Sequence, residues 1–156
     1  MQRVASEIHI PIATGERLHT LEEFGMLLAR NACQYIRPDV CLCGGITQAK
    51  KIAAAAEARG VLVVPHNPLS PVSTAACIQL AASIPNFAIQ EYPLGEDCAP
   101  KNEIVKSTLT LDNGYLTVPD SPGIGIELNE QAMHQYPYKP RLYVTKLRED
   151  GSVVDQ

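Results

Sequence analysis

The chain has 156 residues, enough for one domain with a hydrophobic core, and 46% of them are apolar. Its net charge of −4 offers no basic surface for a nucleic acid, and the absence of Trp argues against a carbohydrate-binding platform of stacked rings. No apolar run approaches the roughly 18 residues of a membrane span, and five cysteines without a secretory signal indicate reduced thiols in a cytoplasmic protein.

Four short apolar segments are typical of β-strands and recur at regular intervals. The segment 61–64 is wholly apolar, which predicts a strand buried on both faces. Each segment is followed by an ionisable residue, and these residues are 23, 27 and 25 positions apart, the length of one strand, one helix and two loops. The predicted strands are 10–14, a segment that begins at 35–36 and ends at Pro38, 61–64 and 87–90, and the ionisable residues are Glu16, Asp39, His66 and Glu91.

Helical patterns fill the intervals between these strands. Thr20-Leu-Glu-Glu23 carries a helix start signal, with Thr20 and Glu23 in the positions of a capping box. The alanine-rich segment 48–59 predicts a second helix, with Thr47 as its N-cap and Gly60 just past its end. A third helix is expected at 73–82. Strands that alternate with helices predict an α/β fold with a parallel sheet and right-handed crossovers.

The pattern changes after Glu91. Asn113-Gly114 is a hairpin turn signal within the segment 109–118. Asn129 is expected to cap a short helix that reaches about Gln135. We therefore divide the chain into residues 1–95, which hold the repeat, and residues 96–156, an extension with the hairpin and the short helix that packs outside the repeat and contributes to a capping region.

The four ionisable residues are the candidate site. In a parallel barrel, side chains just past the carboxyl ends of the strands converge on one mouth, where the chemistry takes place. His66 can act as a general base near neutral pH, and Asp39, one strand earlier, can hold one ring nitrogen and fix the tautomer. Glu16 is a hard oxygen ligand suited to Mg²⁺, and Glu91 can hydrogen-bond a substrate oxygen.

Structural roles are the alternative for each of these side chains. His66 is equally typical of a loop histidine held by a backbone hydrogen bond, and an aspartate after a proline, such as Asp39, often caps a turn. Glu16 is in a position to pair with Arg17 on the surface, and Glu91 to be a solvated loop residue. Their common position at four strand ends favours a functional site.

Several segments resemble the mandelate racemase/muconate lactonizing enzyme branch of the enolase superfamily, and within it the acid-sugar dehydratases of the galactonate dehydratase type. They are Ile10–Arg17, Arg37–Val40, Gly44–Thr47, Pro65–Pro71 and the segment 122–127. The resemblance implies a modified (β/α) barrel with a capping domain. This chain is then expected to form the C-terminal half of that barrel, about four βα units, followed by the hairpin extension.

The resemblance also implies a role for each residue. Glu16 is similar to the third Mg²⁺ ligand of the family, and Asp39 and His66 to its Asp–His dyad, with His66 removing the proton α to a carboxylate. Glu91 is similar to the acid that hydrogen-bonds the substrate carboxylate or enediolate. The implied activity is that of a lyase that dehydrates a sugar acid, with Mg²⁺ as cofactor and loss of the β-hydroxyl as the second step.

Two further carboxylate ligands and a second histidine belong to the third and fourth barrel strands of the family, and we expect those strands to lie outside this chain. The isolated chain is therefore expected to be inactive, and to associate as a homo-oligomer or with the complementary half of the barrel. Two alternatives stay open: a catalytically silent half-barrel or partner-dependent subunit, and a racemase or epimerase that uses the same dyad.

Overall fold

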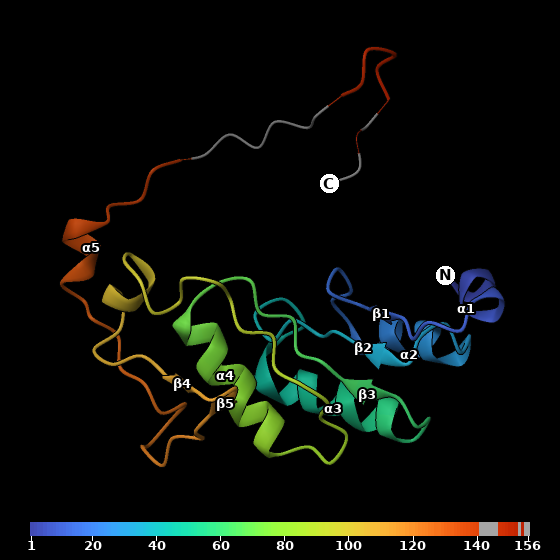
Figure 1. Cartoon of the computed structure of the whole chain (residues 1–156), viewed down its shortest axis with the longest axis horizontal. Coiled ribbons are helices and arrows are strands. Elements are labelled where there is room, and N and C mark those ends of the chain that lie inside the picture. The colour runs from blue at the N-terminus through green and yellow to red at the C-terminus, as the bar shows by residue number, and fades with distance from the viewer. Residues whose placement is uncertain (141–146, 153, 155–156) are drawn as a thin grey trace.

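The computed structural model describes residues 1–140, 147–152 and 154. Its centre is a parallel sheet of three short strands in the order β1 (Ala13–Thr14), β2 (Tyr35–Ile36) and β3 (Leu62–Val63). Ala13 lies opposite Tyr35, and Tyr35 opposite Leu62. The predicted parallel α/β arrangement is confirmed, with strands shorter than the apolar segments that contain them (Figure 1).

The predicted fourth strand is present as a single parallel bridge. Phe87 pairs with Val63, whose backbone N–H donates to Asn86 O at 2.8 Å and whose carbonyl accepts from Ala88 N at 2.9 Å. The segment 87–90 therefore lies beside β3, as its place in the repeat predicts, although regular pairing does not extend beyond Phe87.

Helix α2 (Leu21–Ala29) follows the sequence prediction closely. The Thr20 side chain accepts from Glu23 N at 3.2 Å, and Glu23 Oε2 accepts from Thr20 N at 2.9 Å, so the capping box is formed. This reciprocal pair satisfies backbone donors that have no partner in the first turn of a helix. A short helix that was not predicted, α1 (Gln2–Glu7), precedes β1 and buries none of its residues.

The starts of the next two helices differ from the prediction. Helix α3 (Gly45–Glu57) begins before Thr47, with Gly44 as its N-cap, so Thr47 is not the cap. Gly44 and Gly45 have φ angles of +98° and +83°, which let the chain turn from the loop after Asp39 into the helix. Helix α4 (Pro71–Ala82) begins two residues early, because Ser70 caps it and Pro71 occupies the first position.

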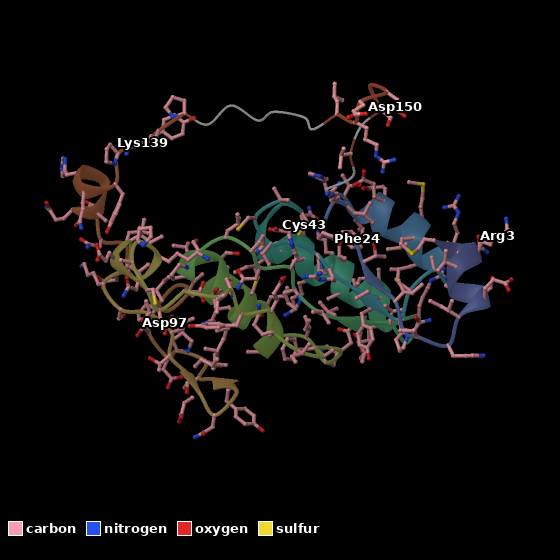
Figure 2. The ribbon with its side chains drawn as sticks, turned by 45° about the horizontal axis from the view of Figure 1, so that its top comes forward. Arg3, Phe24, Cys43, Asp97, Lys139 and Asp150 are labelled. Carbon is pink, nitrogen blue, oxygen red and sulfur yellow. The ribbon has the colours of Figure 1, made fainter. Side chains whose placement is uncertain are left out.

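The helices bury only one face of the sheet. Ile36 and Val63 are fully buried on that face, against a core that includes Phe24 and Cys43 (Figure 2). The opposite face carries Leu62, which is 39% exposed, so the prediction that this strand is buried on both faces is wrong. Because successive side chains of a strand alternate between faces, Leu62 shares the uncovered face with its register partners Ala13 and Tyr35. We call these three residues the open face.

Gly15 connects β1 to Glu16 at a position where only glycine fits. Its φ is +124°, and a Cβ there would lie 2.7 Å from Phe24 Cε1. We expect Gly15→Ala to lower the free energy of unfolding by about 2 kcal/mol, because a strained backbone and a core clash add together. Urea titration measures the change.

The matched control for Gly15→Ala is Gly25→Ala. Gly25 lies in α2, and a Cβ there would meet no atom within 4 Å. Since alanine is a better helix former than glycine, this control is expected to raise the free energy of unfolding by up to about 1 kcal/mol. A midpoint for Gly15→Ala equal to that of the parent chain would contradict the prediction.

The C-terminal region holds the predicted hairpin. Strands β4 (Leu111–Asp112) and β5 (Tyr115–Leu116) pair in antiparallel fashion, and Asn113 and Gly114 both have positive φ angles, as a type I′ turn requires. The 3₁₀ helix η1 (Lys101–Glu103) and the short helix α5 (Ala132–Gln135) complete the described elements.

Asn129 does not cap α5. The N-cap is Gln131, and the Asn129 side chain instead donates to Glu103 O at 2.8 Å, which ties the segment before α5 to η1. No helix in the described part of the chain has the length and apolar character needed to cross a membrane.

Candidate active site

Asp39 and His66 lie side by side just past the ends of β2 and β3. They form an isolated parallel bridge, and His66 N donates to Pro38 O at 3.1 Å. His66 Nδ1 is 2.9 Å from Asp39 Oδ2. The bridge continues the register of β2 with β3, so the contact predicted from the strand spacing is present.

Asp39 is held at both oxygens, which fixes the orientation of the imidazole. Its Oδ1 accepts from Cys41 N at 2.8 Å, and the side chain is 1% exposed. Because a carboxylate oxygen accepts, we assign the Nδ1 proton to the hydrogen bond with Asp39. The Nε2 lone pair of neutral His66 is then free, on a side chain that is 19% exposed. This arrangement can accept a proton at Nε2 from a bound molecule.

Glu91 lies next to this pair through the residue that follows His66. Its Oε2 accepts from Asn67 N at 2.8 Å and from Arg37 Nη2 at 2.5 Å. Partial burial works to raise the pKa of Glu91, but the Asn67 N–H and the hydrogen bond and charge of Arg37 outweigh it and lower the pKa. Glu91 is therefore ionised at neutral pH and acts as a hydrogen-bond acceptor.

Sequence reasoning missed Arg37 and Asn67 as partners of Glu91. The signal for Arg37 was a cation two residues before Asp39 at the same strand end, where a carboxylate at another strand end can reach it. No comparable signal exists for the backbone N–H of Asn67, because its direction depends on the loop conformation.

Among the described residues, Glu16 has no hydrogen bond to the other three site residues. It is half-buried after β1, and among the described residues it forms neither a hydrogen bond nor the ion pair with Arg17 that the sequence left open. The structure thus brings Asp39 and His66 into contact and places Glu91 beside them, whereas Glu16 contributes a separate carboxylate.

The cysteines of the chain are thiols. Cys33, Cys41, Cys43, Cys77 and Cys98 are all free. Burial, with a smaller contribution from the Asp39 charge, raises the pKa of Cys43 to about 11, and burial raises that of Cys77 to about 12. These two buried side chains therefore stay protonated and act as packing residues.

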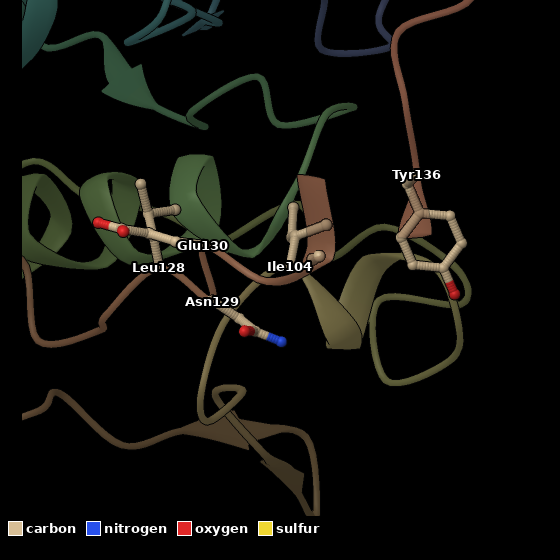
Figure 3. Close-up of a pocket in the computed structure, with 6 residues that line it drawn as sticks. Ile104, Leu128, Asn129, Glu130 and Tyr136 are labelled. Carbon is tan, nitrogen blue, oxygen red and sulfur yellow. The ribbon is translucent and has the colours of Figure 1, made fainter. Parts of the chain in front are cut away.

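Two of the hollows in the described part of the chain lie toward the C-terminal region. A groove of about 440 Å³ runs between α4, the segment 87–92 and the hairpin, with Phe87, Ile89 and Tyr115 among its lining. A smaller hollow of about 220 Å³ lies beside α5, where Ile104, Leu128 and Tyr136 line it (Figure 3). Neither is lined by Asp39, His66 or Glu91, so the candidate site is distinct from both.

Comparison with known proteins identifies the family. Residues 1–132 match the family described as enolase C-terminal domain-like. The chain belongs to the enolase superfamily. It falls in the mandelate racemase/muconate lactonizing enzyme branch, and it is related to galactonate dehydratases. The resemblance read from the segments around Glu16, Asp39 and His66 is therefore confirmed at the level of the family.

Curated relatives and solved structures agree on this assignment. The chain is 35% identical over 133 residues to a D-galactonate dehydratase of Verminephrobacter eiseniae, covering 82% of this chain and 35% of the relative. It superposes with a TM-score of 0.88 and 34% identity on an enolase from Agrobacterium radiobacter bound to sodium and L-malate, covering 97% of this chain and 42% of that one.

A mandelate racemase/muconate lactonizing enzyme from Jannaschia gives a TM-score of 0.83 at 34% identity, covering 90% of this chain and 36% of that one. The enolase-superfamily chain thus spans little more than a third of the length of the curated relatives it matches.

Members of this superfamily typically use a divalent metal ion. In the described residues, no group of three or more His, Cys, Asp or Glu side chains could hold such an ion. Mg²⁺ demands nearly ideal octahedral coordination by oxygen, so the single carboxylate of Glu16 does not by itself fit the ion.

Proposed function

We propose that this enolase-superfamily chain supplies the general base of an acid-sugar dehydratase of the galactonate type. The observation that carries the proposal is the 2.9 Å contact between His66 Nδ1 and Asp39 Oδ2 at the carboxyl ends of two neighbouring parallel strands. Its support is the 35% identity to a D-galactonate dehydratase over most of the chain.

The proposed reaction begins with proton abstraction by His66. Asp39 accepts the Nδ1–H hydrogen bond and stabilises the imidazolium that forms when Nε2 takes the proton α to the substrate carboxylate. The electron pair of the broken C–H bond moves into the carboxylate to give an enediolate. The β-hydroxyl then leaves as water after protonation by an acid, and the resulting enol becomes a 2-keto-3-deoxy acid.

Glu91 and Glu16 have supporting roles in this proposal. Because Glu91 is ionised, it accepts a hydrogen bond from a substrate hydroxyl rather than donating one to the carboxylate. Glu16 is proposed as one carboxylate ligand of Mg²⁺, with the other ligands coming from outside the described residues. We further propose that residues 1–95 form the barrel part and residues 96–156 the extension.

The open face favours one alternative, a subunit that works only with a partner. Leu62 is 39% exposed there, on the side of the sheet that a closed barrel would bury. In this alternative the dyad is assembled on one chain and the metal ligands come from another.

A chimera tests the proposed function. We expect the purified 156-residue chain to leave D-galactonate unchanged in the presence of Mg²⁺. A chimera in which residues 1–132 replace the matching segment of the Verminephrobacter eiseniae enzyme is expected to release the keto acid, measured colorimetrically. Conversion by the isolated chain would contradict the need for further ligands.

The same chimera distinguishes the reactions. A folded chimera that dehydrates no sugar acid would contradict the dehydratase proposal. Exchange of the α-proton with deuterated water, without any loss of water from the substrate, would favour the racemase or epimerase alternative.

A further inference from the structure

A row of buried polar side chains leads from the candidate site into the protein. Asn67, which is fully buried, donates from Nδ2 to Thr74 Oγ1 at 2.7 Å and to the backbone oxygen of Glu91 at 3.0 Å. Thr74 Oγ1 lies 2.5 Å from Glu96 Oε1. Glu96 is 1% exposed, and its Oε2 has no hydrogen-bonding partner among the described residues.

A buried glutamate is a costly residue for a packing position. Burying a carboxyl group with an unpaired oxygen costs free energy that an apolar side chain of similar size would not. The neighbours of Glu96 in this row, Thr74 and Asn67, are polar and fully buried as well, and the row ends at Asn67, which follows His66 and binds Glu91. The row is therefore better explained by the site than by the core.

We propose that Glu96 is a positioning residue for the candidate site, acting through Thr74 and Asn67 on His66 and Glu91. Asn67 directly follows His66, and its backbone N–H binds Glu91 Oε2. Holding the Asn67 side chain at Thr74 and at the Glu91 backbone fixes both the N–H direction and the loop that carries the imidazole. We call the row Glu96, Thr74 and Asn67 the relay. A catalytic role for the relay rests on the proposed function, whereas its effect on the conformation of His66 and Asn67 does not.

With a proton on Glu96, the Thr74 hydroxyl can serve all three of its polar neighbours. A threonine hydroxyl has one proton to donate and can accept two hydrogen bonds. Thr74 Oγ1 accepts from Asn67, and its own proton can reach either Ser70 O at 3.3 Å or Glu96 Oε1. When Glu96 carries the proton and donates it to Thr74, the threonine proton is free for Ser70, and no buried charge is left with an unpaired oxygen.

The electrostatic surroundings of Glu96 agree with the assignment of a proton to its carboxyl group. Burial is the largest influence and raises the pKa of Glu96, whereas the Thr74 hydrogen bond and the charge of Lys101 on η1 act in the opposite direction. The other ionisable groups on this side are Tyr92, whose pKa is raised by burial and by Glu96 and Asp97, and ionised Glu91 at the far end of the row. Lys101 is the one cation acting on Glu96 in the described part of the chain.

The first test is the protonation state of Glu96 in the full 156-residue chain. Carbon-detected NMR of the glutamate carboxyl groups follows each of them as pH rises. Glu96 is expected to keep the chemical shift of a neutral carboxyl at a pH where an ordinary glutamate has ionised. Titration of Glu96 in the ordinary range of a glutamate would overturn the proton assignment and the positioning role drawn from it.

The second test separates positioning from packing by two variants of Glu96. Glu96→Gln keeps a neutral donor to Thr74 and is expected to preserve slow hydrogen exchange at Asn67 N and a single imidazole tautomer at His66. Glu96→Leu fills the space without a donor. It is expected to speed exchange at Asn67 N by roughly tenfold and to lose the single tautomer signal in ¹⁵N NMR. Glu57→Gln is the matched control, with no change expected.

Thr74→Val keeps the shape of Thr74, removes its hydroxyl and covers the case in which Glu96→Leu does not fold. It is expected to reproduce the faster exchange at Asn67 N and the lost tautomer signal at His66. Combining Thr74→Val with Glu96→Leu is expected to add no further change, because both substitutions act on one relay. Folded variants with parental exchange at Asn67 and a parental His66 tautomer would overturn the proposal. None of these measurements uses turnover, so an inactive chimera would refute the proposed function and leave the relay standing.

Discussion

Replacing His66 by alanine in the chimera is expected to lower the rate of α-proton exchange by about 10²–10⁴-fold, the usual loss when a general base is removed. The Nε2 lone pair, freed by the 2.9 Å contact of Nδ1 with Asp39, disappears with the imidazole. Proton NMR of the sugar acid in deuterated water measures the exchange. The affinity for Mg²⁺ should be unchanged, because His66 is not among the proposed ligands.

His9→Ala is the matched control for this variant. His9 is exposed and precedes β1, at the opposite end of the strands from the site. We expect it to leave the exchange rate at the parental value. Exchange that survives in His66→Ala at the rate of this control would refute the role of His66 as the base.

Replacing Asp39 by asparagine is expected to lower the same rate by up to about 10⁴-fold with little change in fold. The carboxylate accepts hydrogen bonds at both oxygens, from Cys41 N and from His66 Nδ1, whereas an amide has one oxygen to offer. When the amide oxygen keeps Cys41 N, its NH₂ group faces Nδ1 and favours the tautomer with the proton on Nε2. The lone pair then points away from the substrate.

The tautomer itself is a second measurement for this variant. In the isolated chain, ¹⁵N NMR should show the His66 proton move from Nδ1 to Nε2 in Asp39→Asn. Exposed Asp120 supplies the matched control, since Asp120→Asn removes a charge of the same sign without touching the imidazole. A parental tautomer together with a lost rate would mean that Asp39 acts by some means other than orienting His66.

Much of the architecture was predictable where local chemistry determines it. The Thr20 capping box and the Asn113-Gly114 turn each depend on a few neighbouring residues, and both formed as expected. The contact between Asp39 and His66 is a long-range feature, yet parallel register fixes it once both strands are placed, because the residues lie equally far past Tyr35 and Leu62.

Other features depended on information that no short segment carries. Thr47 is a good N-cap by type, but the positive φ angles of Gly44 and Gly45 start the helix before it. The exposure of Leu62 depends on what covers the second face of the sheet, which an apolar run cannot reveal. The Arg37–Glu91 ion pair joins residues 54 positions apart through loops whose course the sequence did not predict.

The open face makes the stability of this chain depend on its surroundings. Any molecule that covers Ala13, Tyr35 and Leu62 binds the folded state alone and raises the free energy of unfolding by mass action, by about 2.7 kcal/mol at a hundredfold excess over its dissociation constant. A second copy of the chain obeys the same relation. Melting temperatures of Gly15→Ala and the Glu96 variants are therefore comparable only at one protein concentration. A fall in melting temperature on dilution would report association of a second copy through the open face.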